Sequence, residues 1–293
     1  MLLLNNSNIT IQILVLLCII LTVATLIWCW QTNRLNIYIV GRELGRLGAK
    51  LQTVGLPEVN SKHFTVKYYT GDKEQALMVL RAAEEFIKPV SNHLEYKPHR
   101  KEIIVVYPTR EKLNAYFGWP ADESAMGVYW AGTIRVLAPR EWLETANSNE
   151  AWDKFVNTGP MAHEIAHLIV DYRTRGNYNR WFTEGVAQYI ELKLTGFRFR
   201  EESGNLRNKR YTLTQLNEKY DSLPNQALAY RQSLAAVYYI INQYGEESLA
   251  SIINTLRKGL SLDEALQKEC GVNLDQFEDQ LNNWLDYNWE IFS

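Results

Sequence analysis

Residues 161–191 read MAHEIAHLIVDYRTRGNYNRWFTEGVAQYIE, and this stretch decides the fold class. His163 and His167 are four positions apart, so in a helix both imidazoles project from one face and can bind the same ion. Glu164 lies beside the first histidine, where its carboxylate can reach a water molecule on that ion. The spacing predicts a Zn²⁺ site on a helix, with Glu164 as the general base. Two histidines on a buried helix face without a metal remain the alternative.

The third ligand of such a site is predicted from the residues that follow. A catalytic zinc ion takes three protein ligands and keeps one position open. No histidine follows His167, and Glu184 comes 17 residues later, which leaves room for a turn and an antiparallel second helix. Gly185 and Ala187 would let this second helix approach the first closely. Glu191 lies near the same face as Glu184, and we interpret it as a surface or helix-packing charge.

HEIAH followed by WFTEGVAQYIE resembles the gluzincin metallopeptidases, specifically the peptidase MA-like family. The second stretch is similar to the WLNEGFA segment of the zinc aminopeptidases. The resemblance is specific over residues 161–191 and looser from the 127–139 hairpin through the helices that end near Leu285. It implies a zincin-like fold, zinc as the cofactor and a peptide or protein substrate. It also implies the general-base role for Glu164 and the ligand roles for His163, His167 and Glu184.

One departure from that family concerns how a substrate is held. The aminopeptidase branch carries a GAMEN segment, whose glutamate binds the free amine of the substrate. The comparable hairpin here, residues 124–132, reads SAMGVYWAG and has no acidic residue. This difference favours an endopeptidase over an aminopeptidase, and an extended peptide could add along the hairpin as a further strand.

Two further residues are candidates for the site. Peptide hydrolysis needs a donor for the developing oxyanion, and Tyr230 is the predicted donor, because the stretch around it resembles the family's tyrosine-bearing stretch after the third ligand. Its place in an apolar stripe leaves core packing open, and Tyr238 and Tyr239 are weaker candidates. Asp171 lies near the face of the two histidines and is predicted to accept from a ring N–H. A surface carboxylate at the helix end is the alternative.

The residues around the motif predict an α+β architecture, with a mixed N-terminal lobe that holds a small sheet and a helical C-terminal lobe. Stretches with alternating side-chain character predict strands, and the two residues Ala131 and Gly132 between two such stretches predict a hairpin. Apolar spacing predicts helices, and beyond residue 150 the strand signals vanish. Residues 52–61 have the composition of a linker. The expected strands are 62–69, 101–107, 126–130 and 133–137, and the expected helices of this lobe are 72–96 and 109–117.

The N-terminal segment is apolar. The first charged residue is Arg34, and residues 9–30 form an uncharged run of 22 residues, which is long enough to cross a bilayer. The sequence therefore predicts one uncleaved transmembrane helix, a lipid bilayer as a partner and a single-pass membrane localisation. The basic residues that follow the run favour a cytoplasmic C-terminal part.

Residues 34–51 show apolar and basic side chains at helical spacing. This pattern is typical of a helix that lies on a membrane surface, or of a solvated linker helix. The predicted units of the chain are a transmembrane anchor at 1–33, a juxtamembrane helix and linker at 34–61, and a peptidase MA-like domain at 62–293.

Composition limits the class of protein. Hydrophobic residues make up 46% of the chain, which supports a sizeable core and excludes wholesale disorder. The net charge of −2 gives no basic footprint and argues against nucleic-acid binding. These features together predict a membrane-anchored zinc metallopeptidase that hydrolyses peptide bonds through a zinc-activated water. The alternatives are a catalytically silent, membrane-tethered zinc-binding or scaffold protein, and a zinc hydrolase that is not a peptidase.

Overall fold

The structure, a computed structural model, describes residues 12–23, 25, 34–121, 125–144, 147–199, 201–207 and 209–292. This part of the chain contains one five-stranded sheet in the order β1-β2-β3-β5-β4. The three inner strands β2, β3 and β5 run parallel, whereas β1 and β4 are antiparallel edge strands. The strands are β1 (Glu58–Asn60), β2 (Phe64–Tyr68), β3 (Glu102–Tyr107), β4 (Gly127–Trp130) and β5 (Thr133–Leu137).

Helices alternate with the strands in the first half of the chain and make up all regular elements described beyond residue 147. This arrangement confirms the predicted α+β architecture of a mixed lobe followed by a helical lobe. The helices are α2 (Arg34–Gln52), α3 (Lys73–His93), α4 (Arg110–Phe117), α5 (Ser148–Thr158), α6 (Met161–Thr174), α7 (Arg180–Thr195), α8 (Leu213–Lys219), α9 (Gln226–Tyr244), α10 (Glu246–Arg257), α11 (Leu262–Cys270) and α12 (Leu274–Asn288).

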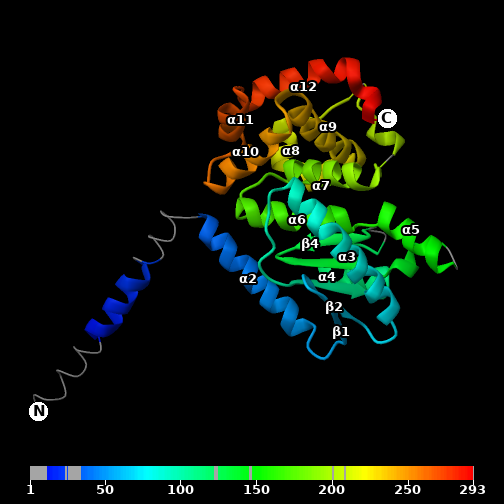
Figure 1. The fold of residues 1–293 in the computed structure, drawn as a ribbon. Coiled ribbons are helices and arrows are strands. Elements are labelled where there is room, and N and C mark those ends of the chain that lie inside the picture. Colours follow the sequence, from blue (N-terminus) through cyan, green and yellow to red (C-terminus); the bar gives the residue numbers. More distant parts are fainter. Residues whose placement is uncertain are drawn as a thin grey trace, which may run out of the picture.

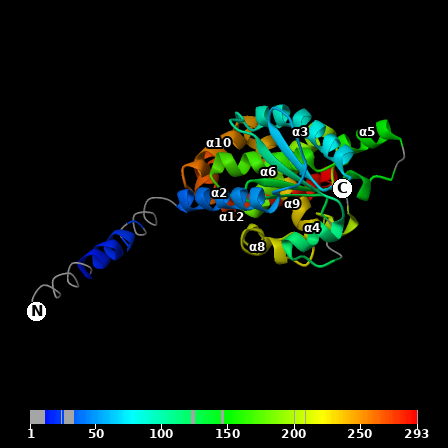
Figure 2. The same ribbon diagram turned by 90° about the horizontal axis from the view of Figure 1, so that it is seen from below.

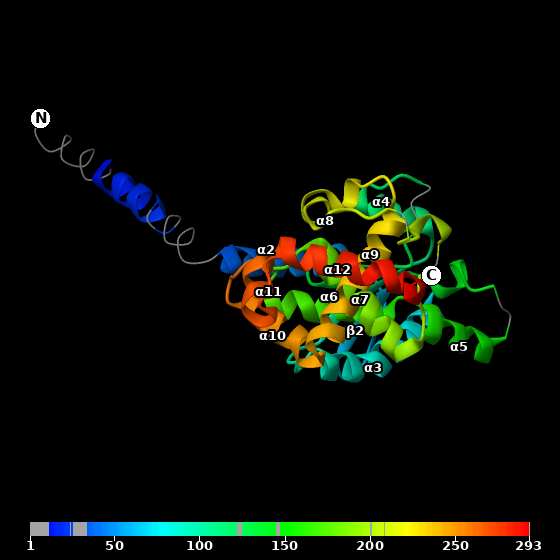
Figure 3. The ribbon, with the colours of Figure 1, turned by 90° about the horizontal axis from the view of Figure 1, so that it is seen from above.

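Helices cover both faces of the sheet. Ile104 and Val106 of β3 are buried in the main core with residues of α3 and α6, whereas Ile103 and Val105 pack with Leu113 of α4 on the opposite face. α6 and α7 lie between the sheet and helices α8 to α12 (Figure 1). Seen from above, α12 runs over α9 (Figure 3), and side-chain hydrogen bonds join the two helices. The HEIAH segment on α6 therefore lies at the boundary between the two lobes.

The predicted strands and helices of the first lobe are present, with their ends shifted by a few residues. Thr109 caps α4, because its side chain accepts from the backbone N–H of Lys112. The hairpin turns at Ala131 and Gly132, which both have positive φ. Strand β1 lies within the predicted linker 52–61 and is not predicted from the sequence. It is only three residues long and depends on its pairing with β2, which a local pattern does not show.

The predicted transmembrane anchor is corrected by the structure. Of residues 9–30, only 12–23 and 25 are described, and the others lie outside the described residues. No helix in the described part of the chain is long and apolar enough to cross a membrane. This finding contradicts the prediction of a transmembrane helix, together with its single-pass localisation and its bilayer partner.

Helix α2 packs its basic side against the rest of the domain. Arg46 forms an ion pair with Glu102 and donates to the carbonyl of Gly132 at 2.7 Å. Arg42 forms an ion pair with Asp171 at 2.9 Å. Both arginines are buried, so they have lost their water and depend on these partners. Seen from below, α2 lies alongside the domain (Figure 2), which corrects its interpretation as a solvated linker helix; a helix on a membrane surface stays a prediction.

Asp171→Asn is expected to lower the free energy of unfolding by roughly 3–5 kcal/mol, because it leaves the buried Arg42 without its counter-charge. Asp279→Asn makes the same acid-to-amide change at an exposed carboxylate of α12. Its expected loss is less than about 1 kcal/mol. Urea denaturation of both variants beside the wild type measures the difference. Equal, small losses in the two variants would contradict the Arg42–Asp171 pair as the anchor of α2.

Candidate metal centre

Two imidazoles meet on one face of α6. The helix starts after Pro160 and ends at Arg175 and Gly176, whose positive φ angles of 60° and 80° reverse the chain toward α7. His163 and His167 lie one turn apart, and their Nε2 atoms are 3.0 Å from each other. Nearly all other residues of α6 are buried, which fixes the helix and the direction of both rings.

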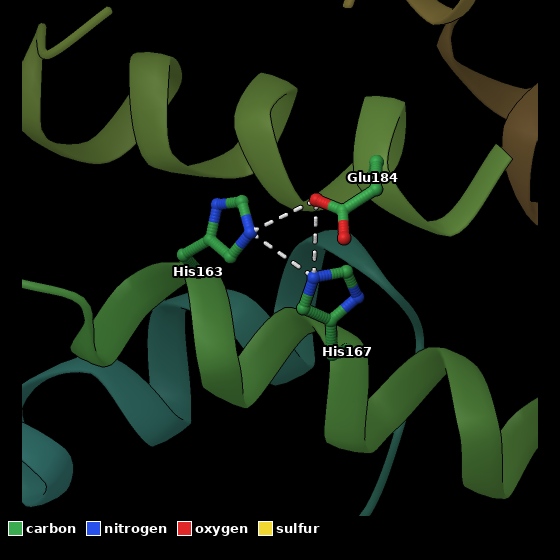
Figure 4. Close-up of side chains that lie close together, drawn as sticks. All are labelled: His163, His167 and Glu184. Atoms are coloured by element: carbon green, nitrogen blue, oxygen red, sulfur yellow. Dashed lines mark hydrogen bonds and ion pairs between the residues drawn. The ribbon is translucent and has the colours of Figure 1, made fainter. Parts of the chain in front are cut away.

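Helix α7 brings a carboxylate to these rings. Oε2 of Glu184 lies 3.3 Å from Nε2 of His163 and 3.5 Å from Nε2 of His167. Figure 4 shows the three side chains pointing toward one another from the two helices. The structure therefore brings together the three residues that the motif spacing singled out.

Gly185 lets α7 approach α9 closely, and α6 is not the helix that it faces. A Cβ atom at this position would lie 2.2 Å from the backbone oxygen of Ser233 and 2.6 Å from a methyl group of Val237, both on α9. This contact corrects the expectation that Gly185 faces the HEIAH helix. The close packing of α7 on α9 therefore fixes the position of the helix that carries Glu184.

The three groups fit a zinc ion. Zinc takes imidazole nitrogen at about 2.0–2.1 Å and carboxylate oxygen at about 2.0–2.2 Å, so a tetrahedral site places neighbouring ligand atoms roughly 3.3–3.5 Å apart. The three separations here run from 3.0 to 3.5 Å. Oε1 of Glu184 is bound by Arg180 at 2.9 Å, whereas Oε2 is buried and accepts no hydrogen bond from the residues described. Oε2 is thus the oxygen that a metal can use, and three of the described residues offer ligand atoms to one ion.

The charges around the three groups favour a cation. Burial raises the pKa of Glu184, but Arg180 and the imidazoles outweigh burial and hold this pKa well below its ordinary value. Burial lowers the pKa of His167 to about 4, which keeps the ring neutral, as a ligand must be. Burial also lowers the pKa of His163, but the carboxylates of Glu184 and Glu191 outweigh it and raise this pKa well above its ordinary value. Positive charge is therefore stabilised at His163, where a bound cation can replace a proton.

Glu164 faces the same site without belonging to the three convergent groups. Its carboxylate accepts from the backbone N–H of Tyr129 on β4, and its Oε2 is buried without a hydrogen-bond partner among the described residues. A Cβ atom at Gly127 would lie 2.9 Å from Cγ of Glu164, so β4 passes directly beside it. Burial raises the pKa of Glu164 to about 7. A group with this pKa can both accept and release a proton near neutral pH.

Two residues that the sequence did not single out for this role hold the imidazoles. Nδ1 of His163 lies 3.4 Å from Oε2 of Glu191, and Nδ1 of His167 lies 2.7 Å from Oγ1 of Thr183. These contacts leave the Nε2 atoms of both rings for a metal. Glu191 is buried and touches the site, which corrects its interpretation as a surface or packing charge. Its spacing of two helical turns from Glu184 is the signal in the sequence that could have assigned it.

Asp171 contacts neither imidazole, which corrects its predicted role. Its carboxylate accepts from the hydroxyl groups of Tyr129, at 2.6 Å, and Tyr38, and it pairs with Arg42. Eight positions along the helix separate it from His163, which corresponds to about 12 Å. Asp171 instead joins α2 and β4 to the end of α6.

Tyr230 lies on α9, half-buried, and packs against the hydrophobic core. The negative charge of Glu184 raises its pKa, and burial adds to this effect, so the hydroxyl stays protonated and can donate. The two weaker candidates, Tyr238 and Tyr239, pack against Trp284 of α12. Tyr230 lies close enough to Glu184 for the negative charge of Glu184 to raise the tyrosine pKa. It is therefore the best candidate for the donor.

The comparison with known families decides the relationship. The sequence model of the Peptidase MA superfamily matches residues 129–287, just over half of the chain. The chain belongs to the Peptidase MA superfamily. The matched region runs from β4 to α12 and includes the three convergent side chains. Membership in this superfamily indicates zinc as the cofactor, as the sequence predicted, and supports a peptidase function in general.

Solved structures are also similar to this chain. An M1 zinc metallopeptidase from Deinococcus radiodurans matches with a TM-score of 0.42 and 14% identity, over 78% of this chain and 50% of that one. A mutant M1 zinc metallopeptidase from the same organism, bound to a Tyr-Ser-Ala substrate, matches with a TM-score of 0.43 and 15% identity over the same shares. This chain thus spans about half the length of these structures. No curated protein sequence matches it.

Zinc binding tests the centre. The wild type is expected to bind about one zinc ion per chain, and Glu184→Gln is expected to lose it with the third ligand. Glu191→Gln is expected to lower zinc affinity by roughly 10- to 100-fold, because it releases the ring of His163. Competition with a chelating dye measures the affinity. Glu247→Gln changes an exposed carboxylate of α10 and serves as the control, with wild-type affinity expected. Unchanged affinity in Glu191→Gln would contradict its role in holding the ring.

Proposed function

We propose that this chain is a zinc-dependent endopeptidase. The observation that carries the proposal is the convergence of His163, His167 and Glu184 beside Glu164, which has a buried and unpartnered oxygen. Membership in the Peptidase MA superfamily supports a peptide as the class of substrate. The lack of an acidic residue in the stretch 124–132 supports cleavage within a peptide, because no anchor for a free amine is present there.

The proposed roles follow from the positions of the side chains. Bound zinc supplies Lewis acidity, which polarises the scissile carbonyl and makes a water molecule acidic near neutral pH. Glu164 accepts the proton of this water on Oε2 and later delivers it to the leaving amine. The protonated hydroxyl of Tyr230 donates to the developing oxyanion. Arg180 holds Oε1 of Glu184 and so keeps Oε2 directed at the two imidazoles.

Strand β4 is the proposed platform for the substrate. It is an edge strand, paired with β5 on one side only in the described sheet. An extended peptide that adds along the other side would form main-chain hydrogen bonds with β4, the strand whose Gly127 packs closely against Glu164. Trp130 at the end of the strand is 60% exposed and offers an apolar contact for a substrate side chain.

Glu164→Gln is expected to lower kcat by roughly 10²- to 10⁴-fold, because the amide cannot take a proton from water. Its zinc content is expected to stay at the wild-type level, since Glu164 is not among the three convergent groups. The measurement is cleavage of a fluorogenic peptide library with acetylated amino termini, beside metal analysis. Glu218→Gln, an exposed carboxylate on α8, is the matched control and should cleave like the wild type.

The same assay separates the alternatives. Cleavage only of peptides with a free amino terminus would contradict the endopeptidase assignment and leave a zinc peptidase. Wild-type protein that holds zinc but cleaves no peptide would contradict the proposal and favour a catalytically silent zinc-binding protein.

Tyr230→Phe removes one hydroxyl group and keeps the ring that packs on the core. The variant is expected to lose roughly 100-fold or more in kcat/KM, with zinc affinity and thermal stability unchanged, since a donor to the oxyanion is worth about 3 kcal/mol. Tyr238→Phe on the same helix is the control. Equal rates in the two variants would show that Tyr230 serves packing alone.

A further inference from the structure

The outward face of α2 is apolar and uncovered. The helix turns its basic side inward, so its aliphatic side chains point away from the domain. Their exposed fractions show that no described element covers them. An exposed apolar surface of this kind marks an interaction site. It consists of six side chains, each 50–75% exposed: Ile37, Val40, Leu44, Leu47, Leu51 and, just after the helix, Val54.

These side chains repeat every seven residues. Positions 37, 44 and 51 form one series, and positions 40, 47 and 54 form a second series three residues further on. This is the a and d pattern of a helix that pairs with another helix. Gly41 and Gly48 flank the seam at the e positions, and a Cβ atom added there would meet nothing within 4 Å. The seam is therefore narrow and open on its flank, so the backbone of a second helix can come close.

We propose that α2 pairs with α2 of a second copy of this chain, in antiparallel orientation. A two-fold axis between residues 45 and 46 makes the seam self-complementary, as a symmetric dimer requires. Each of the six aliphatic side chains then lies opposite another member of the same set. The layers pair 37 with 54, 40 with 51, and 44 with 47 of the second copy.

Charged residues flank the seam on one side. Glu43 and Lys50 occupy the g positions there; Lys50 is exposed, whereas the 44% exposed side chain of Glu43 accepts hydrogen bonds on both oxygens from Arg100 of the same copy. Antiparallel pairing brings Lys50 close to Glu43 of the second copy, twice by symmetry. A parallel pair would instead place the g positions beside the glycines at e. The antiparallel pair therefore adds Lys50 to the Glu43–Arg100 ion pair, whereas the parallel pair gives Lys50 no charged neighbour across the seam.

The inner face of α2 argues against a lipid surface as the partner. A helix that binds anionic lipids presents several lysines or arginines to the headgroups. Here Arg42 and Arg46 are buried in ion pairs with Asp171 and Glu102, inside the domain. A lipid-binding helix also carries a broader apolar face than a seam of a and d positions. The seam suits a second helix better than a membrane.

Sedimentation equilibrium of the full-length chain tests the proposal. The wild type is expected to form dimers, and Leu47→Glu is expected to weaken the dimer at least tenfold, because it places two charges at the centre of the seam. Leu77→Glu makes the same change at a 46% exposed leucine of α3, away from the seam, and should keep wild-type association. Zinc content equal to the wild type shows that both variants are folded. A monomeric wild type, or equal weakening by both variants, would overturn the proposal.

Cross-linking tests the orientation. In a chain with Cys18, Cys29 and Cys270 replaced by alanine, a mixture of Ile37→Cys and Val54→Cys is expected to form disulfide-linked dimers under mild oxidation. Ile37→Cys alone should not, because the two copies of residue 37 lie about 26 Å apart in the antiparallel pair. Efficient linking of Ile37→Cys alone would contradict this orientation. A monomeric wild type that binds phosphatidylcholine–phosphatidylserine vesicles, and loses this binding in Leu47→Glu, would assign the seam to lipid instead.

Discussion

The buried charge of Glu184 is the constraint on which the site depends. The carboxylate is almost completely removed from water, and such a charge is stable only when opposite charge and hydrogen-bond donors surround it. Arg180 compensates one oxygen, and the second oxygen faces two imidazoles. The close packing of α9 on Gly185 fixes the position of α7, the helix that carries this carboxylate. A divalent cation held by Oε2 and the two imidazoles would complete the compensation.

The sequence predicted the parts of this site that depend on one helix at a time. The spacing of His163 and His167 is a property of α6 alone, and the HEIAH motif limits what the next helix must supply. Glu191 and Thr183 contact the imidazoles because of how α7 is positioned along α6. The residue spacing within one helix does not show this relative position. The predicted role of Asp171 is based on the helix face that it shares with the histidines. Its distance from them along the helix axis instead brings it into contact with Arg42 and Tyr129.

Helix α2 shows the same limit for the fold. Its amphipathic pattern is clear in the sequence, but the pattern does not say which face turns inward. Isolated arginines usually face water, and here Asp171 and Glu102, far along the chain, provide buried partners that reverse the rule. Strand β1 is a similar case, because its three residues are ordered by β2 and carry little signal of their own. Long-range partners decide both elements.

Tyr129 connects helix α2 with the candidate metal centre. Its hydroxyl donates to Asp171, which also binds Arg42 of α2, and its backbone N–H donates to Glu164. The edge strand β4 is therefore held at one residue by both the outer helix and the proposed base. If a peptide adds along β4, as proposed, the attachment of α2 fixes the distance between the main chain of that peptide and Glu164. The basic face of α2 thus supports the candidate metal centre through β4, while its apolar face is exposed.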